Sequence, residues 1–350
     1  MTTDYTKRLF LWVFLPAFIF ISGCSSVPKT SKNWPQKVLK TLSLREKIAQ
    51  MMIYRMHLKY KDVTPEKWKE ITSLLDGDGI GGIHLWSGDG SSSIAIMNEI
   101  QKRSRIPIIF DADIERGFGQ RFPSGTDFPP MMAITATGNP ENAYEVGKIV
   151  ATESRAAGIH WNLSPVVDVN NNPLNPIINT RSFSEDADIV SEFSKKYTKG
   201  LQNHGMIATA KHFPGHGAVA TDSHEDLPVD RREFSELLDD IYPYESLIRK
   251  NTVPAVMMAH IIYKEADNLP ASISEYWMKN HLRHQLNFNG VIFSDDLSMH
   301  ALRNYGDTVT RADKALRSGC DMILICNDRE NTKKVINFLK TQKKISKILY

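Results

Sequence analysis

The sequence predicts one α/β domain, a single (β/α)₈ barrel of the TIM type, and three observations support this fold class. From about residue 40 onward, eight short apolar runs rich in β-forming residues alternate with eight longer helical patterns, and the last pattern is helical. Near-continuous apolar strands separated by helices are typical of parallel sheets that are covered on both faces. The chain has 350 residues, which suits one barrel of about 250 residues with modest extensions. An open doubly wound sheet is the alternative that this pattern leaves standing.

The expected elements alternate along the chain, each apolar run being taken as a strand and each longer amphipathic stretch as the helix that follows it. In order, we expect strand Ile48–Tyr54 and a helix near 65–75, Gly79–Trp86 and 91–104, Ile106–Asp111 and 140–157, Gly158–Asp168 and 185–204, Ile207–His212 and 233–250, Ala255–Ile261 and 274–286, Val291–Asp295 and 308–318, and Cys320–Cys326 and 329–347. No internal repeat or linker divides residues 35–350, so we expect one domain there.

Composition excludes several classes of protein. Hydrophobic residues make up 41% of the chain and charged residues 24%, which is ordinary for a globular protein and excludes a polytopic membrane protein, a disordered chain and a collagen-like fibre. The formal net charge of +3 is too small to indicate nucleic-acid binding. Three cysteines exclude a disulfide scaffold.

The amino terminus has the features of a secretory signal. Lys7 and Arg8 precede an apolar run, Leu9–Ile21, that is too short to span a membrane as a helix, although an uncleaved anchor helix is the alternative. The ending Ile21-Ser22-Gly23-Cys24 resembles a bacterial lipoprotein signal. The resemblance implies removal of residues 1–23, lipidation of Cys24, a tether over 24–34 and a location in the cell envelope as a periplasmic or outer-membrane lipoprotein.

Two further cysteines, Cys320 and Cys326, flank one expected strand. At about 3.3 Å per residue they would lie about 20 Å apart, far beyond the reach of a disulfide. We therefore expect two free thiols.

Chemically active side chains follow most of the expected strands. In a barrel, the carboxyl ends of the strands meet at one rim, and catalytic residues lie there. The side chains at these ends are Asp111 and Asp113, Asp168, Lys211 and His212, His260, Asp295 and Asp296, and Asn327 and Asp328. Together they predict a polar active-site pocket rather than solvated surface.

The segment after the fifth expected strand is the most informative. Lys211–Gly217 is followed by Asp222 and His224, and a carboxylate beside an imidazole fixes its tautomer and raises its proton affinity, as a general acid requires. A loop held only by local hydrogen bonds is the alternative. Zinc binding by His212 and His216 is a second one, but Pro214-Gly215 between them disfavours the helix that this spacing needs, so we expect no metal.

Several motifs, in the same order along the chain, resemble glycoside hydrolase family 3 in its β-N-acetylhexosaminidase branch. They are Lys211–Gly217 with Asp222-Ser223-His224, Gly290–Met299 around Asp295, Leu282–Gln285 with His281 at a usually aliphatic position, Asn179–Phe183 and Pro165–Val169. The similarity extends from about residue 40 to 330. Family 3 β-glucosidases typically add a second domain with a glutamate acid, and this chain has no room for one.

The resemblance implies a retaining mechanism with Asp295 as nucleophile and His224, oriented by Asp222, as acid and base. Retaining enzymes more often pair two carboxylates about 5–5.5 Å apart. A neutral imidazole, unlike a second carboxylate, does not repel the nucleophile. Asp296 is expected to support the site and His260 to line the pocket. The residues implied to bind the terminal sugar are Asp113, Arg121, Arg181, Lys211 and His212.

The match is imperfect after the third expected strand. The family's Asp-Gln-Glu-Gly-Gly-Arg-Val-Gln-Arg corresponds to Asp113–Arg121, which departs from it at Ile114, Arg116, Phe118 and Gly119. The departures spare the nucleophile and the acid but bear on the preference for sugar and leaving group.

The function that the resemblance implies is removal of terminal β-linked N-acetylglucosamine from peptidoglycan fragments or chitin oligosaccharides. It implies a carbohydrate substrate, no cofactor, no nucleic-acid partner, membrane attachment through Cys24 and a monomer. Two alternatives remain, a β-N-acetylglucosaminide phosphorylase that uses the same residues and a catalytically silent sugar-binding lipoprotein.

Overall fold

The computed structural model describes residues 33–77, 79–326 and 329–342. The signal, Cys24, nearly all of the tether, and Asn327 and Asp328 lie outside the described residues, so lipidation and location stay predictions. The chain forms two compact units, Met1–Thr41, which contains helix α1 (Trp34–Thr41), and Leu42–Tyr350. Within the described part, no helix has both the length and the apolar character needed to cross a membrane.

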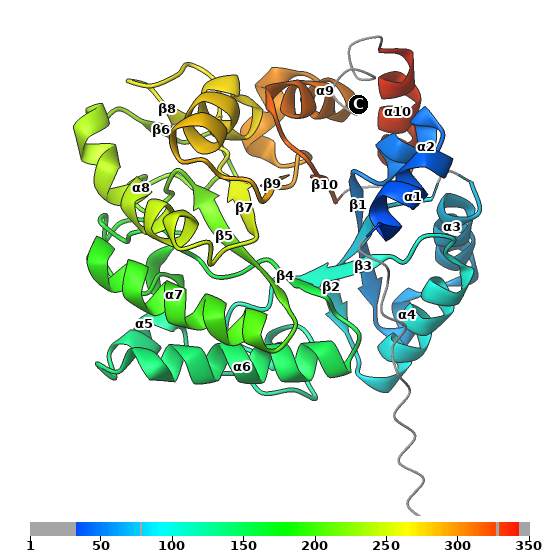
Figure 1. The fold of residues 1–350 in the computed structure, drawn as a ribbon, viewed down its shortest axis with the longest axis horizontal. Coiled ribbons are helices and arrows are strands. Elements are labelled where there is room, and N and C mark those ends of the chain that lie inside the picture. The colour runs from blue at the N-terminus through cyan, green and yellow to red at the C-terminus, as the bar shows by residue number, and fades with distance from the viewer. Residues whose placement is uncertain (1–32, 78, 327–328, 343–350) are drawn as a thin grey trace, which may run out of the picture. The chain divides into compact units, whose positions relative to one another are not determined.

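The larger unit is built on eight parallel strands in one sheet. They are β1 (Met52–Leu58), β2 (Gly82–Gly88), β3 (Ile109–Ala112), β4 (Trp161–Asn162), β5 (Ile207–Phe213), β7 (Ala255–Met258), β9 (Val291–Ser294) and β10 (Ile323–Ile325). Their order is β10-β1-β2-β3-β4-β5-β7-β9. The edge strands meet where Phe293 pairs with Met322 and the amide of Ser294 donates to the carbonyl of Met322 at 3.1 Å. The predicted (β/α)₈ barrel is confirmed (Figure 1).

Helices connect the strands and lie outside them (Figure 1). They are α2 (Leu44–Ala49), α3 (Pro65–Leu75), α4 (Ser91–Arg103), α5 (Met131–Thr135), α6 (Pro140–Ala156), α7 (Ala187–Asn203), α8 (Phe234–Arg249), a π-helix (Tyr276–Gln285), α9 (Thr308–Ser318) and α10 (Arg329–Thr341). Side chains of Asn139, Asp186 and Asp307 accept backbone hydrogen bonds in the first turns of α6, α7 and α9, which explains where these helices begin.

Most expected strands differ from the observed ones by up to three residues at an end, and two differ more. Ile48 belongs to α2, because Ser43 and Glu46 form a reciprocal capping box that starts a helix there, so β1 begins only at Met52. The strand expected over Gly158–Asp168 is reduced to the two residues of β4. Pro165 has no N–H to donate, and beyond β4 the regular pairing gives way to an isolated bridge from Val166 to Lys211 and single hydrogen bonds such as that from Thr209 to Ser164. The two-residue parallel strands β6 (Val229–Asp230) and β8 (Ile262–Tyr263) were not expected at all.

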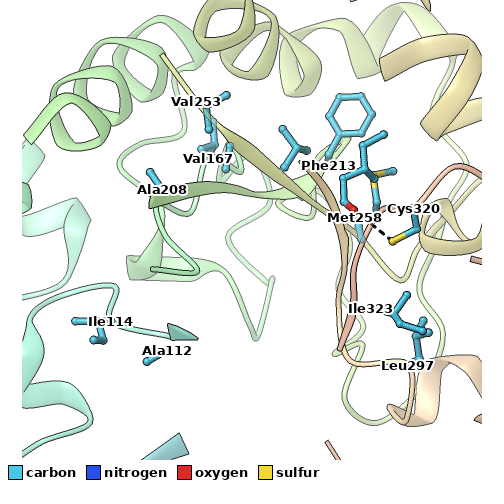
Figure 2. Packing of buried hydrophobic residues seen from close by; sticks show 14 of the residues in the cluster. Ala112, Ile114, Val167, Ala208, Phe213, Val253, Met258, Leu297, Cys320 and Ile323 are labelled. Carbon is cyan, nitrogen blue, oxygen red and sulfur yellow. Dashed lines mark hydrogen bonds between the residues drawn. The ribbon is translucent and has the colours of Figure 1, made fainter. Parts of the chain in front are cut away.

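The strands separate two hydrophobic cores. The inner core fills the barrel and consists of Ile53, Trp161, Leu163, Ala255, Met257, Phe293 and Leu324. A larger core lies between the strands and the helices, and Figure 2 shows part of it, including Phe213, Met258 and Cys320. Cys320, three residues before β10, and Cys326, directly after it, are free thiols. Because side chains alternate along a strand, the inward residues above the inner core point to the carboxyl rim.

The π-helix encloses a histidine with no polar contact. His281 is 5% exposed and packs against the rings of Phe213 and Trp277. Neither of its ring nitrogens has a hydrogen-bond partner among the described residues. Burial lowers the pKa of His281 to about 4, so the imidazole is neutral in the folded protein at neutral pH.

Replacing this histidine by leucine is expected to stabilise the protein, and increasingly so in acid. The pKa of His281 is lower in the folded protein than in the unfolded chain. Protonation of the unfolded chain therefore destabilises the folded protein, an effect that is absent above about pH 6.5 and grows as the pH falls towards 4. Below the folded pKa this effect lowers the free energy of unfolding by about 3 kcal/mol. Urea unfolding of wild type and His281→Leu at pH 7 and pH 5 measures the effect. An equal difference between the two proteins at both pH values would contradict it.

Candidate active site

The carboxyl rim of the barrel holds a cavity of about 470 Å³. Alternation along the strands carries the chain from inner-core residues to polar ones, for example from Phe293 to Asp295. Most of the side chains that line the cavity are polar, charged or aromatic, and they include Arg55, Trp86, Asp113, Glu115, Arg116, Arg121, Arg181, Lys211, His212, His216, His224, Asp295 and Asp296. Leu163, Met257 and Leu324 also line it, so the cavity ends on the inner core.

One wall of the cavity is a chain of alternating charges. The Lys211 ammonium lies 2.7 Å from a carboxylate oxygen of Asp113 and 2.8 Å from one of Glu115, and Glu115 in turn pairs with Arg181 at 2.8 Å. Arg121 donates through Nε to the backbone carbonyl of Asp113 at 3.0 Å. Burial alone would raise the pKa of Asp113, but Lys211 and its other cationic neighbours lower it to about 2. The carboxylate is therefore ionised and can accept hydrogen bonds from a ligand.

A buried histidine and aspartate lie behind this wall. His84 and Asp111, on neighbouring strands β2 and β3, are fully buried, with Nδ1 of His84 2.6 Å from Oδ1 of Asp111. The other ring nitrogen of His84 lies 3.6 Å from Asp113. Burial alone would lower the pKa of His84, but Asp111 and Asp113 raise it, while burial raises the pKa of Asp111. The pair therefore shares a proton beneath the wall.

Asp295 follows β9 and lines the cavity from the opposite side of the inner core. Its Oδ1 accepts the amide of Asp296 at 2.8 Å. Burial alone would raise the pKa of Asp295, but His260, His212 and this amide lower it, so the carboxylate is ionised. His260 is buried outside the cavity lining, where it accepts the hydroxyl of Ser272 at 2.6 Å and donates to the carbonyl of Asp296 at 2.9 Å. The expectation that His260 lines the pocket is wrong, because both of its ring nitrogens are bonded to buried neighbours, Ser272 and the backbone of Asp296.

The loop after β5 is held by the buried carboxylate of Asp168. This carboxylate accepts the amide of His216 at 2.7 Å and Nδ1 of His212 at 2.8 Å. At Gly217 the loop passes so close to the preceding segment that a Cβ would lie 1.6 Å from the carbonyl oxygen of Val169, which only glycine allows. Asp168 therefore positions the loop and lies outside the cavity lining.

The same loop places the predicted histidine–aspartate pair at the cavity edge. Oδ1 of Asp222 accepts both the amide and Nδ1 of His224, each at 2.8 Å, which leaves the other ring nitrogen of His224 free to exchange protons. The neighbouring Ser223 lies 3.1 Å from Nε2 of His216. Burial lowers the pKa of His216 to about 4, so a neutral imidazole anchors this turn. The side chain of His224 is 58% exposed, which gives a ligand access to it.

The structure brings the predicted site residues together. The residues that line one cavity are Asp113, Arg121, Arg181, Lys211, His212, His224 and Asp295, and Asp222 contacts His224 behind them. Of the departures after the third expected strand, Arg116 reaches the cavity and forms a 3.4 Å ion pair with Asp127. Ile114 and Phe118 are buried, and Phe118 stacks on Phe122.

Sequence reasoning missed Arg55, Trp86 and His84, and it did not predict that His84 pairs with Asp111. Arg55 lies two residues after Ile53 of the inner core, and His84 lies two residues before Trp86, so strand alternation was the signal that could have found them. Within the described residues, no three histidine, cysteine, aspartate or glutamate side chains are arranged to hold a metal ion.

Comparisons with known proteins agree with this geometry. Residues 43–348 match the Glycosyl hydrolase family 3 N terminal domain. The chain is 38% identical over 295 residues to a beta-hexosaminidase of Actinobacillus pleuropneumoniae serotype 3 (strain JL03), which covers 81% of this chain and 84% of the relative.

Two solved structures are similar to the chain. NagZ from Neisseria gonorrhoeae, in complex with N-trifluoroacetyl-D-glucosamine, is 31% identical with a TM-score of 0.73, over 86% of this chain and 88% of that one. A family 3 beta-N-acetylglucosaminidase from Paenibacillus sp. str. FPU-7 is 29% identical with a TM-score of 0.81, over 88% of this chain, which spans only 61% of that longer one. The family match covers most of the chain and the whole barrel, and on this basis the protein belongs to glycoside hydrolase family 3 and is a glycoside hydrolase.

Proposed function

We propose that the protein is a retaining exo-β-N-acetylglucosaminidase that removes terminal β-linked N-acetylglucosamine from peptidoglycan fragments or chitin oligosaccharides. The observation that carries the proposal is that Asp295 and the Asp222-paired His224 line the same cavity. The named activities of the relatives support the choice of sugar.

In the first step, a carboxylate oxygen of Asp295 attacks the anomeric carbon, and the bond from that carbon to the leaving oxygen breaks. The lowered pKa of Asp295 supports this role, because the attacking group must be ionised. His224, protonated on both nitrogens, gives its free N–H proton to the leaving oxygen, and Asp222 holds the other N–H. The result is a glycosyl ester on Asp295 and a neutral His224.

In the second step, water attacks the same carbon from the face that the leaving group vacated. His224 takes a proton from this water, the ester bond breaks and Asp295 leaves as a carboxylate. Two inversions at the anomeric carbon give a product with the original β configuration. Both proton transfers use one histidine, which therefore ends the cycle in its starting state.

The cavity suits the end of a saccharide chain. It ends on Leu163, Met257 and Leu324 of the inner core, so a sugar bound there has no path onward through the barrel. We propose that the charged wall around Asp113 and Lys211 binds the hydroxyls of this terminal sugar, since carboxylates and cations both form strong hydrogen bonds with hydroxyls.

The experiment is release of chromophore from 4-nitrophenyl N-acetyl-β-glucosaminide by the purified protein, with the α-anomer and the β-glucoside as controls. We expect release from the first substrate alone, and proton NMR of the fresh product should show the β anomer. No release at any pH between 5 and 8 would contradict the proposal. In phosphate buffer, sugar 1-phosphate in place of free sugar would instead identify a phosphorylase.

The His224→Ala variant is expected to discriminate between leaving groups. A general acid contributes about 10²–10⁴-fold, and a dinitrophenolate leaves without needing a proton whereas a sugar alcohol does not. We therefore expect a loss of at least about 10²-fold in kcat/KM on chitobiose and a much smaller loss on the dinitrophenyl glycoside. Asp222→Asn, which keeps the histidine, should lie between wild type and His224→Ala. Equal losses on the two substrates would remove His224 from the role of acid.

A further inference from the structure

Arg55 differs from the other cations of the cavity in having no anionic partner. It follows Ile53 of the inner core on β1 and lines the cavity. Among the described residues its guanidinium forms no hydrogen bond or ion pair, and its one recorded contact is with the ring of Trp86, 4.7 Å from the centroid. By contrast, Lys211 and Arg181 both pair with Glu115 at 2.8 Å.

The position of Arg55 separates it from the charged wall. Along β1 and β2 it pairs in register with His84, and on its other side lies β10. The wall residues lie after β3, in the segment between β4 and β5, and on β5, and Asp295 follows β9. Arg55 and Trp86 therefore occupy the arc of the rim between Asp295 and Asp113, where no role proposed above is assigned.

Trp86 holds the guanidinium ready for a ligand. The indole is 37% exposed, and it carries Arg121 at 4.6 Å as well as Arg55 at 4.7 Å. Stacking on an aromatic ring satisfies the face of a guanidinium but leaves its N–H edge open, and that edge matches the two oxygens of a carboxylate. A cation held half-buried without an anion is unfavourable, and an anionic ligand group would remove this cost.

We propose that Arg55, stacked on Trp86, forms a subsite for an anionic substituent of the saccharide substrate. The subsite makes the enzyme selective for acidic saccharides over neutral ones such as chitin oligosaccharides. The inference rests on the proposed function, since it concerns the substrate of the same cavity. The acidic group has two possible sources, the leaving sugar and the terminal sugar, and the ligand chemistry is the same in both.

Matched pairs of substrates that differ only in charge test the subsite. In the first pair, N-acetylglucosamine is β-linked to a sugar that carries a lactyl ether, either as the free carboxylate or as its amide. In the second pair, the aryl glycoside of the terminal sugar carries a C6 carboxylate or the corresponding amide. The measurement is the ratio of kcat/KM for acid to that for amide, in wild type, Arg55→Met, Arg55→Lys and the control Arg103→Met.

We expect Arg55→Met to lower this ratio at least about tenfold in one of the two pairs, and that pair identifies the source of the charge. Arg55→Lys keeps the positive charge but loses the paired N–H groups of the guanidinium, so its ratio should lie between those of wild type and Arg55→Met. Arg103 lies outside the cavity lining and pairs with Asp76 at 2.6 Å, so its replacement should leave the ratio as in wild type. An unchanged ratio in both pairs for Arg55→Met would overturn the proposal.

Binding separates this inference from the proposed function. Calorimetry of the same acid and amide compounds with Asp295→Asn, with and without Arg55→Met, compares affinities without turnover. A wild type that cleaves the neutral aryl substrate while Arg55→Met shows no change in selectivity leaves the function standing and the subsite wrong. The opposite result is also informative. If the wild type cleaves nothing, but the protein binds the acid at least about tenfold more tightly than the amide and loses this difference with Arg55→Met, the subsite is supported and the proposed function is wrong.

Discussion

The Asp295→Ala variant is expected to release chromophore from 4-nitrophenyl N-acetyl-β-glucosaminide at least about 10⁴-fold more slowly than wild type. The variant loses the only group proposed to attack the anomeric carbon, so neither the glycosyl ester nor its hydrolysis is possible. The carboxylate it removes is held by the amide of Asp296 and already lines the cavity, so no conformational change is needed to expose it. Initial rates at pH 7 measure the loss in kcat/KM.

Its neighbour provides the matched control. The carboxylate of Asp296 accepts the hydroxyl of Ser298 at 2.7 Å and the amide of Cys326 at 3.0 Å, so we expect it to support the site and not to attack. Asp296→Asn should lose far less activity than Asp295→Ala. Azide, which fits the space left by the carboxylate, should restore cleavage by Asp295→Ala and give the α-glycosyl azide. A greater loss for Asp296→Asn would assign the role of nucleophile to Asp296. A β-glycosyl azide as the product would contradict the role of Asp295.

The second large effect concerns stability. Replacing His84 alone by leucine is expected to lower the free energy of unfolding by about 3–5 kcal/mol, because it leaves the carboxylate of Asp111 buried without a partner. Oδ2 of Asp111 already has no hydrogen-bond partner within the described chain, and Oδ1 has only His84. The double variant His84→Leu/Asp111→Ala removes both polar groups and should lie within about 2 kcal/mol of wild type.

Urea unfolding at pH 7 of wild type, His84→Leu, Asp111→Ala and the double variant completes the cycle. The coupling between the two positions should be large, with the double variant more stable than His84→Leu alone. Additive losses would mean that the pair contributes no more than two separate packing residues. They would also mean that the shared proton beneath Asp113 is absent.

The sequence predicted the barrel and most of the cavity because both depend on local patterns. Apolar runs with alternating helices were sufficient for the fold, and polar residues at strand ends were sufficient to place Asp113, Lys211 and Asp295 at one rim. The Asp222 and His224 pair was found because its members are two residues apart. Resemblance to a family supplied their roles, which spacing alone does not assign.

What could not be predicted depends on contacts between distant segments. His84 and Asp111 are 27 residues apart, and their partnership follows from the register of β2 and β3. The buried function of Asp168 depends on where the loop after β5 turns back. The strand expected over Gly158–Asp168 contained Pro165, which has no N–H to donate. This missing donor is a physical reason why β4 is short. His260 was misplaced because sequence shows that a residue ends a strand but not which way its ring turns.

The loop after β5 separates two parts of the chemistry that many active sites combine. Asp113 and Asp295 belong to the ends of strands, whereas His224 belongs to a loop whose attachments are Asp168 and His216. We therefore expect changes in the length or sequence of that loop to alter the proposed proton transfer while the residues proposed to bind the sugar stay in place. The strands of the barrel can stay unchanged while the loop that carries the proposed acid and base varies. Natural variation and laboratory evolution can therefore act on this loop first.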